Sequence, residues 1–344
     1  MKKIRTYYKI FTLISFLSLS YGYTNVDEVT KVATAAANWL KLETGTRAIG
    51  MGGAFTSIDA GIIGIPYNPA SVAFIKNQEG FLSKTSYVAD INYHVLGYGR
   101  NLSGIDYVAL HIFFLDSGPM KVTNEWWPDG TGENFNFTGM CVRAAFGKRI
   151  TNRLRIGFAA KFIREQIYTT YMQSYALDIG SNFTTGIYGF VLGMSISNLG
   201  PEVRFVGDGL EFPCEDEDAN APTGFCEKIT SYFMLPLTFR LGVSNEVMGP
   251  NSDMIKNAHH KLLISVDAIN PIDYTLYSAA GIEYSYDDMF FLRGGSHFGH
   301  DTADWSVGGG INIKLKNYQF GLDYAYVDYG ILHYTHQFGL NFKF

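Results

Sequence analysis

The chain has 344 residues and a formal net charge of −5, with 47% hydrophobic, 15% aromatic and 17% charged residues. Soluble domains contain about 25% charged residues, so this composition is unusually poor in charge. The negative balance argues against a nucleic-acid-binding surface, and no nucleic-acid partner is expected. At this length an all-β barrel commonly forms a single domain.

The first residues have the pattern of a secretory signal peptide, which we assign to residues 1–22. Basic residues between positions 2 and 9 precede an apolar stretch from 10 to 19, and small residues follow up to Gly22. The apolar stretch is shorter than the roughly 20 residues that a membrane helix needs. We therefore predict cleavage after Gly22, which leaves a mature charge of about −9.

From position 80 to 344 the sequence predicts a transmembrane antiparallel β-barrel of about 14 strands. The mature chain offers no apolar run long enough for a membrane helix, so a spanning structure must use strands. Apolar and aromatic residues alternate with small or polar ones in segments of about ten residues. In one such segment Tyr318, Phe320 and Leu322 share a face opposite Gln319 and Asp323. In another, Leu154, Ile156 and Phe158 oppose Arg155 and Lys161, which are expected to face inward.

The last strand carries the most specific signal. Its alternation places large apolar residues on one face and ends on an aromatic residue, with Phe338, Leu340, Phe342 and Phe344 as the candidate barrel-assembly signal. A soluble sandwich could show the same alternation, but an edge strand with exposed phenylalanines would risk aggregation. The pattern favours a cell outer-membrane location, with membrane lipid and the barrel-assembly machinery as partners.

Two connections are too long for tight turns and are expected on the outer side of the membrane. The connection 118–133 carries Trp126 and Trp127, which are candidates for an apolar groove, for the interfacial aromatic girdle, or for contact with an extracellular partner. The connection 200–228 carries Cys214 and Cys226, which are the candidate disulfide pair of an exported protein.

Residues 23–79 do not follow the barrel pattern and are interpreted as an N-terminal plug. Apolar residues at helical spacing predict a short helix from Val26 to Leu42. A stretch rich in glycine and other small residues follows, which indicates close and irregular packing.

This segment resembles the PorV/PorQ family, whose members are relatives of the FadL-type outer-membrane transporters. The resemblance is carried by "ANWLKLETGTRAIGMGGAF" and "YNPASVA", and its motif residues are Arg47, Gly50, Met51, Gly52, Gly53, Asn68 and Pro69. The likeness to FadL-type proteins implies a fourteen-stranded barrel with the N-terminal segment folded into its lumen. In that arrangement Arg47 is expected to pair with lumenal carboxylates such as Asp323.

Two functions remain open. The PorV-type hypothesis is a non-enzymatic component of type IX protein secretion that binds exported cargo proteins and delivers them to the surface attachment complex. The alternative is a FadL-like channel that transports a hydrophobic small molecule. No catalytic, cofactor-binding or metal-binding residues are assigned, because neither the glycines of "GMGGAF" nor the scattered histidines have the context that such sites require.

Overall fold

A computed structural model describes residues 31–214, 224–316 and 318–344, of which Val32–Phe344 belong to one compact unit. The assigned signal peptide and the acidic run 215–218 lie outside the described residues. No helix within the described ranges is both long enough and apolar enough to cross a membrane.

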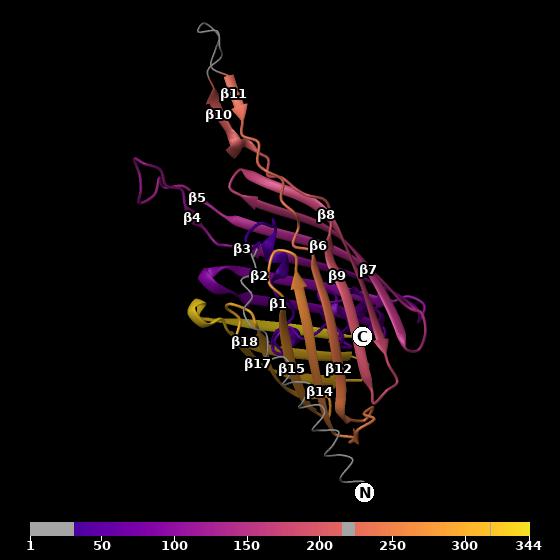
Figure 1. Ribbon diagram of the computed structural model, residues 1–344. Helices are drawn as coiled ribbons and strands as arrows, with labels where there is room; N and C mark the ends of the chain where they lie inside the picture. Colours follow the sequence, from indigo (N-terminus) through magenta and orange to yellow (C-terminus); the bar gives the residue numbers. More distant parts are fainter. Residues whose placement is uncertain (1–30, 215–223, 317) are drawn as a thin grey trace. The chain divides into compact units, whose positions relative to one another are not determined.

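The described strands close into a 14-stranded antiparallel barrel, as the sequence predicts (Figure 1). Each strand pairs with its neighbour in the chain, and pairing of the first strand with the last closes the ring. The barrel strands are β1 (Gln78–Ser86), β2 (Asn92–Asn101), β3 (Asp106–Asp116), β6 (Phe137–Arg149), β7 (Leu154–Ile167), β8 (Thr170–Thr184), β9 (Phe190–Leu199), β12 (Thr238–Gly249), β14 (His260–Pro271), β15 (Tyr277–Tyr286), β16 (Phe290–Phe298), β17 (Trp305–Leu315), β18 (Tyr318–Asp328) and β19 (Tyr334–Lys343).

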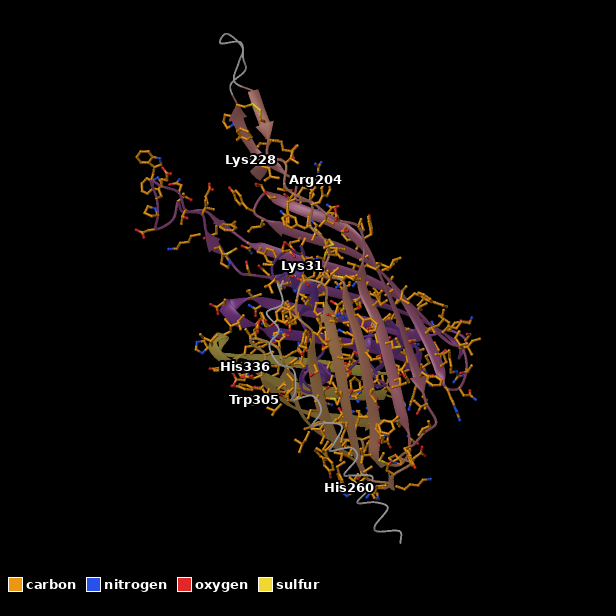
Figure 2. All side chains as sticks on the ribbon, in the orientation of Figure 1. Lys31, Arg204, Lys228, His260, Trp305 and His336 are labelled. Carbon is orange, nitrogen blue, oxygen red and sulfur yellow. A yellow bond between two sulfur atoms is a disulfide. The ribbon has the colours of Figure 1, made fainter. Side chains whose placement is uncertain are left out.

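The connections divide between the two ends of the barrel. At one end, β3 leads into the small sheet of β4 (Met120–Lys121) and β5 (Asn134–Phe135), and β9 leads toward the hairpin of β10 (Glu211–Cys214) and β11 (Gly224–Glu227). We call this end the mouth. The far end carries short turns such as 102–105 and 150–153, and the two-residue strand β13 (Ile255–Lys256). Figure 2 shows His260 at the far end and Arg204 at the mouth.

The outer surface is apolar, and the inner face of the barrel carries the polar and small residues that the alternation predicts, together with buried large apolar side chains such as Phe113 and Ile163. Leu322 is 55% exposed, whereas its neighbour Asp323 is 5% exposed and faces the lumen. Phe158 is likewise exposed, and Lys161 is buried inside the barrel. An outward apolar surface of this kind suits the hydrocarbon layer of a membrane.

Residues 32–77, which we call the N-terminal segment, lie against the inner wall of the barrel. The segment contains η2 (Asn38–Lys41), α2 (Thr46–Ile49), η3 (Gly61–Gly64) and η4 (Pro69–Phe74). Its η4 contacts β6, β7 and β8, while α2 contacts β17, β18 and β19 on another part of the wall. The segment therefore touches strands from widely separated parts of the ring.

The predicted helix from Val26 to Leu42 is wrong over its described part. Residues 31–37 are not helical, and only the single 3-10 turn of η2 follows them. Ala33 and Ala37 have the positive φ angles of the left-handed region, and the Ala36 N–H donates to the Met234 carbonyl oxygen at 3.0 Å. The spacing of the apolar residues does not produce a helix here, because the backbone at Ala36 forms a hydrogen bond with Met234, which is distant in the sequence, instead of a helical one.

Glycines in the barrel wall make room for the N-terminal segment. A Cβ atom placed on Gly157 would lie 2.3 Å from the Ala70 backbone nitrogen, and one on Gly295 would lie 2.2 Å from the Gly52 nitrogen. Real Cβ atoms do not approach backbone so closely, so any larger residue at these places would push the segment away. Gly193 and Gly281 meet the backbone of the segment in the same way.

We expect Gly295→Ala to displace the N-terminal segment, because the added methyl group has no space against the Gly52 backbone. Overpacking of this kind costs about 1–3 kcal/mol, so thermal unfolding should shift down by several degrees and protease should cut the segment faster. Gly294→Ala is the matched control, since its nearest neighbour would be at 3.8 Å. Equal behaviour of the two variants would contradict the close packing described here.

Candidate functional site

Arg47 of the N-terminal segment is anchored to the barrel by an ion pair. Its Nε and Nη2 atoms donate to both carboxylate oxygens of Glu283 on β15, at 2.8 and 2.7 Å. Arg293 on β16 also binds Glu283 and reaches Asp323 on β18. Arg47 therefore pairs with a lumenal carboxylate, as expected, but the partner is Glu283 and not Asp323, which Arg293 binds.

A second buried network lies on the opposite part of the wall. Lys161 and Asp178 are completely buried, and their charged atoms are 2.7 Å apart. Arg143 lies 3.3 Å from the same carboxylate and contacts His111. Because each charge has an opposite charge beside it, the lumen wall carries these ions without leaving an isolated one.

The mouth contains a cavity of about 410 Å³ beside the N-terminal segment. We call it the mouth cavity. It is lined mainly by apolar and aromatic side chains from the segment, the loop after β1, the ends of β3, β6 and β7, and the connection between β9 and β12: Ala35, Ala36, Ala37, Asn38, Trp39, Leu42, Tyr87, Ile91, Leu115, Phe137, Glu165, Phe205 and Phe233. Binding sites for small molecules usually have this size and character.

Trp39 forms the inner wall of the mouth cavity. Its ring stacks on Phe113 with 5.4 Å between ring centroids, and it packs so closely on Gly139 that a Cβ there would lie 2.7 Å away. The indole Nε1 donates to the Glu165 carboxylate at 2.8 Å. Trp39 is thus held by the stack on Phe113, by close packing on Gly139 and by the hydrogen bond at its polar edge.

The connection between β9 and β12 folds back over the mouth. Val203 and Phe233 exchange two backbone hydrogen bonds of 2.8 Å, and Val206 pairs in the same way with Tyr171 on β8. Phe205 and Phe233 from this connection line the mouth cavity. The cavity is therefore closed on one side by a loop that is itself hydrogen-bonded to the barrel rim.

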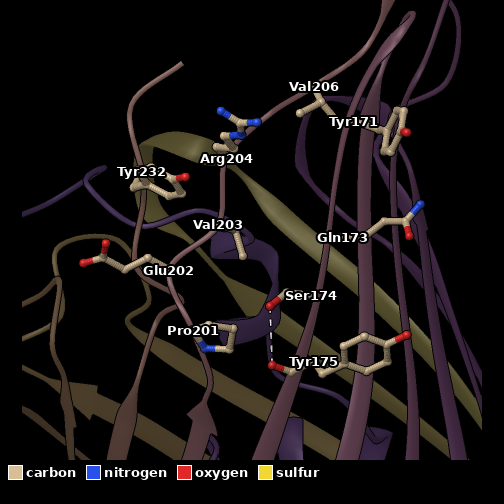
Figure 3. A pocket seen from close by; sticks show the side chains of 10 residues that line it. All are labelled: Tyr171, Gln173, Ser174, Tyr175, Pro201, Glu202, Val203, Arg204, Val206 and Tyr232. Carbon is tan, nitrogen blue, oxygen red and sulfur yellow. Dashed lines mark hydrogen bonds between the residues drawn. The ribbon is translucent and has the colours of Figure 1, made fainter. Parts of the chain in front are cut away.

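A second cavity of about 390 Å³ lies on the other side of this connection. Figure 3 shows it between β8 residues such as Tyr171 and Gln173 and the loop residues Glu202 and Arg204. It forms because β9 pairs with β8 only as far as Leu199, so the start of β8 faces a loop. Its lining is more polar than that of the mouth cavity.

The seven motif residues from Arg47 to Pro69 are spread along the inner wall and do not line the mouth cavity. Met51, Gly52 and Gly53 pack near β15, β16 and Glu43, and Gly50 lies beside Gly308. The Asn68 side-chain amide donates to the Thr56 and Ser181 carbonyl oxygens, each at 2.8 Å, and Pro69 packs against Gly157. These residues join segment to wall, and their predicted plug role stays a prediction.

The remaining candidate residues lie on the outside. Cys214 and Cys226 are joined by a disulfide across the β10–β11 hairpin. Trp126 and Trp127 are 85% and 64% exposed in the connection that holds β4 and β5, and they do not reach the mouth cavity. On β19, Phe338 and Leu340 point outward, as the alternation predicts, and Phe342 is half-buried. Phe344, which follows the strand, is exposed.

Neither Trp39 nor Glu165 stands out in the sequence as a site residue. A signal for Glu165 was present, because it follows the inward-facing Lys161 by four residues on the same strand and so shares its face. Trp39 lies inside the motif that carries the family resemblance, but its contacts depend on Gly139 in a distant strand. No spacing rule connects those two positions.

The fold matches solved outer-membrane channels. The Pseudomonas putida toluene transporter TodX superposes with a TM-score of 0.56 at 11% identity, over 88% of this chain and 97% of that one. The Ralstonia pickettii toluene transporter TbuX gives 0.54 at 12% identity, over 88% and 98%. A Pseudomonas aeruginosa FadL homologue gives 0.51 at 10% identity, over 88% and 98%.

No protein-family model matches the sequence, and no curated protein matches it. At the identities found, the structural likeness establishes the fold alone. The chain therefore has the fold of FadL-type outer-membrane barrels, and its apolar outer surface agrees with that location.

We expect Arg47→Ala to weaken the attachment of the N-terminal segment. Breaking a buried ion pair costs about 3 kcal/mol, and here the Glu283 side chain is only 4% exposed. Thermal unfolding should shift down, and the segment should become sensitive to protease. Lys314→Ala is the control, because its pair with Asp288 is exposed and 3.9 Å long. An unchanged melting profile for Arg47→Ala would count against an anchoring role.

Proposed function

We propose that this protein is a non-enzymatic outer-membrane channel for hydrophobic small molecules, and that the mouth cavity is their first binding site. The observation that carries the proposal is the apolar and aromatic lining of that cavity at the end of the barrel with the long connections. Two structures of the same fold are described as toluene transporters, which supports a hydrophobic cargo.

In this proposal the N-terminal segment acts as a plug. It fills the lumen beneath the mouth cavity with tightly packed residues such as Met51, Ile65 and Val72, none of which is exposed. A molecule held in the mouth cavity contacts the segment directly through Trp39 and Leu42. Passage then requires the segment or the neighbouring loop to move, because the packed residues leave the cargo no space.

The secretion hypothesis has less support. It rests on the sequence motifs that resemble PorV/PorQ proteins, whereas two of the structural neighbours named above are described as toluene transporters. The motif residues join the N-terminal segment to the wall, a task that a barrel of either function needs. We therefore prefer the transport hypothesis.

The proposal predicts that filling the mouth cavity blocks binding. Ile91→Trp adds an indole ring at a lining position, and it should weaken binding of 1-methylnaphthalene by at least about tenfold, since lost apolar burial of this size exceeds 1.4 kcal/mol. Binding is measured by ligand fluorescence with the protein in phosphatidylcholine nanodiscs. Uptake of the same compound into intact cells should fall in parallel.

Ile187→Trp serves as the control, because Ile187 is 64% exposed in a turn at the far end of the barrel. It should bind and transport like the original protein. If Ile91→Trp bound the compound as tightly as this control, the mouth cavity would not be the binding site.

A further inference from the structure

We infer that Glu165 makes the mouth cavity selective for hydrophobic molecules that carry a hydrogen-bond donor, an amine above all, over hydrophobic carboxylates. The inference rests on the proposed function and names the class of molecule that the same site prefers. Its basis is the charge and hydrogen bonding of the side chains that line the cavity.

Glu165 is the acidic group of the mouth cavity. It faces inward near the end of β7 and is only 9% exposed. Among the described residues that line the cavity, none is a lysine, arginine or histidine. A hydrophobic carboxylate would therefore enter a low-dielectric space that holds a like charge and offers no basic side chain.

The Glu165 carboxylate has two hydrogen-bond donors but no counter-ion within the described chain. Its Oε2 accepts from Trp39 Nε1, the Ala37 backbone also donates to the carboxylate, and no lysine, arginine or histidine among the described residues forms a salt bridge with it. The other buried carboxylates described above, Asp178 and Glu283, each have basic partners. Glu165 differs from them, and a ligand ammonium group would supply the charge that it lacks.

The other polar side chains of the mouth cavity also favour a ligand that donates hydrogen bonds. The Asn38 side chain donates from Nδ2 to the Ala35 carbonyl oxygen, while its Oδ1 is buried and has no hydrogen-bond partner among the described residues. Burial raises the pKa of the Tyr87 hydroxyl above its ordinary value, so this group stays neutral at physiological pH. The lining thus offers acceptors in Glu165 and Asn38, and no cation.

The aromatic side chains fit the apolar part of such a molecule. Trp39, Phe137, Phe205 and Phe233 surround the cavity, and Trp39 is held in place by the same hydrogen bond that orients Glu165. An aromatic amine or alcohol can therefore place its ring among them and its donor near the carboxylate. Aromatic faces also attract a cationic amine, which adds to the preference.

The test compares four ligands with one ring system: 1-naphthylmethylamine, 1-naphthylmethanol, 1-methylnaphthalene and 1-naphthylacetate. Binding to the full chain in phosphatidylcholine nanodiscs is measured by ligand fluorescence, with empty nanodiscs subtracted. We expect the amine to bind most tightly, followed by the alcohol and the hydrocarbon, with the carboxylate weakest. Hydrogen bonds to charged groups contribute about 1.5–3 kcal/mol, which corresponds to a preference of about tenfold or more.

Glu165→Gln isolates the charge. A glutamine side-chain oxygen can still accept from Trp39 Nε1, so the cavity should keep its shape. The amine should then lose about tenfold in affinity, the carboxylate should gain, and the hydrocarbon should change by less than about twofold. Glu202→Gln, a change of the same type in the second cavity, should leave the order of the four ligands unaltered.

The outcomes separate this inference from the proposed function. If the original protein bound all four ligands equally, or if its preference survived Glu165→Gln, the selectivity would be overturned while the binding site stood. If none of the four bound, the proposed function would fail with it. The ligand order in the original protein is informative by itself, even if the variant did not fold.

Discussion

The backbone of the N-terminal segment touches the barrel wall at glycines on β7, β9, β15 and β16, with no wall side chain between them. This close approach sets the position of everything else in the lumen. Because Pro69 and Ala70 lie directly against Gly157, and Gly52 against Gly295, the segment has little freedom to rotate or slide. Close packing against a wall glycine, Gly139, also positions Trp39, which forms the inner wall of the mouth cavity.

Ion pairs add directional contacts to the close packing. The two hydrogen bonds between Arg47 and Glu283 fix the register of the N-terminal segment against the barrel wall. The lumen can hold these two charges because they are paired with each other. Glu165 differs because it is hydrogen-bonded to Trp39 but has no basic partner among the described residues. It lies beside the mouth cavity, where we propose that a ligand supplies the opposite charge.

Much of the barrel could be predicted from the sequence, because a strand with lipid on one side and the lumen on the other tends to alternate apolar residues with polar or small ones. The lumen could not be predicted equally well. The helix expected up to Leu42 fails because Ala36 bonds to a distant loop, and Arg47 finds Glu283 because Arg293 already holds Asp323. Such contacts depend on the stagger between strands, which one sequence does not reveal.

The seam between β1 and β19 has a consequence for assembly. Every other pair in the ring joins strands that follow each other in the chain, and these can form locally as the chain emerges, whereas the seam joins strands as far apart as Glu79 and Lys343. The N-terminal segment leads directly into β1, so it borders the seam. We therefore expect the N-terminal segment to be enclosed before β1 pairs with β19. The barrel would then close around a segment that already lies in its lumen.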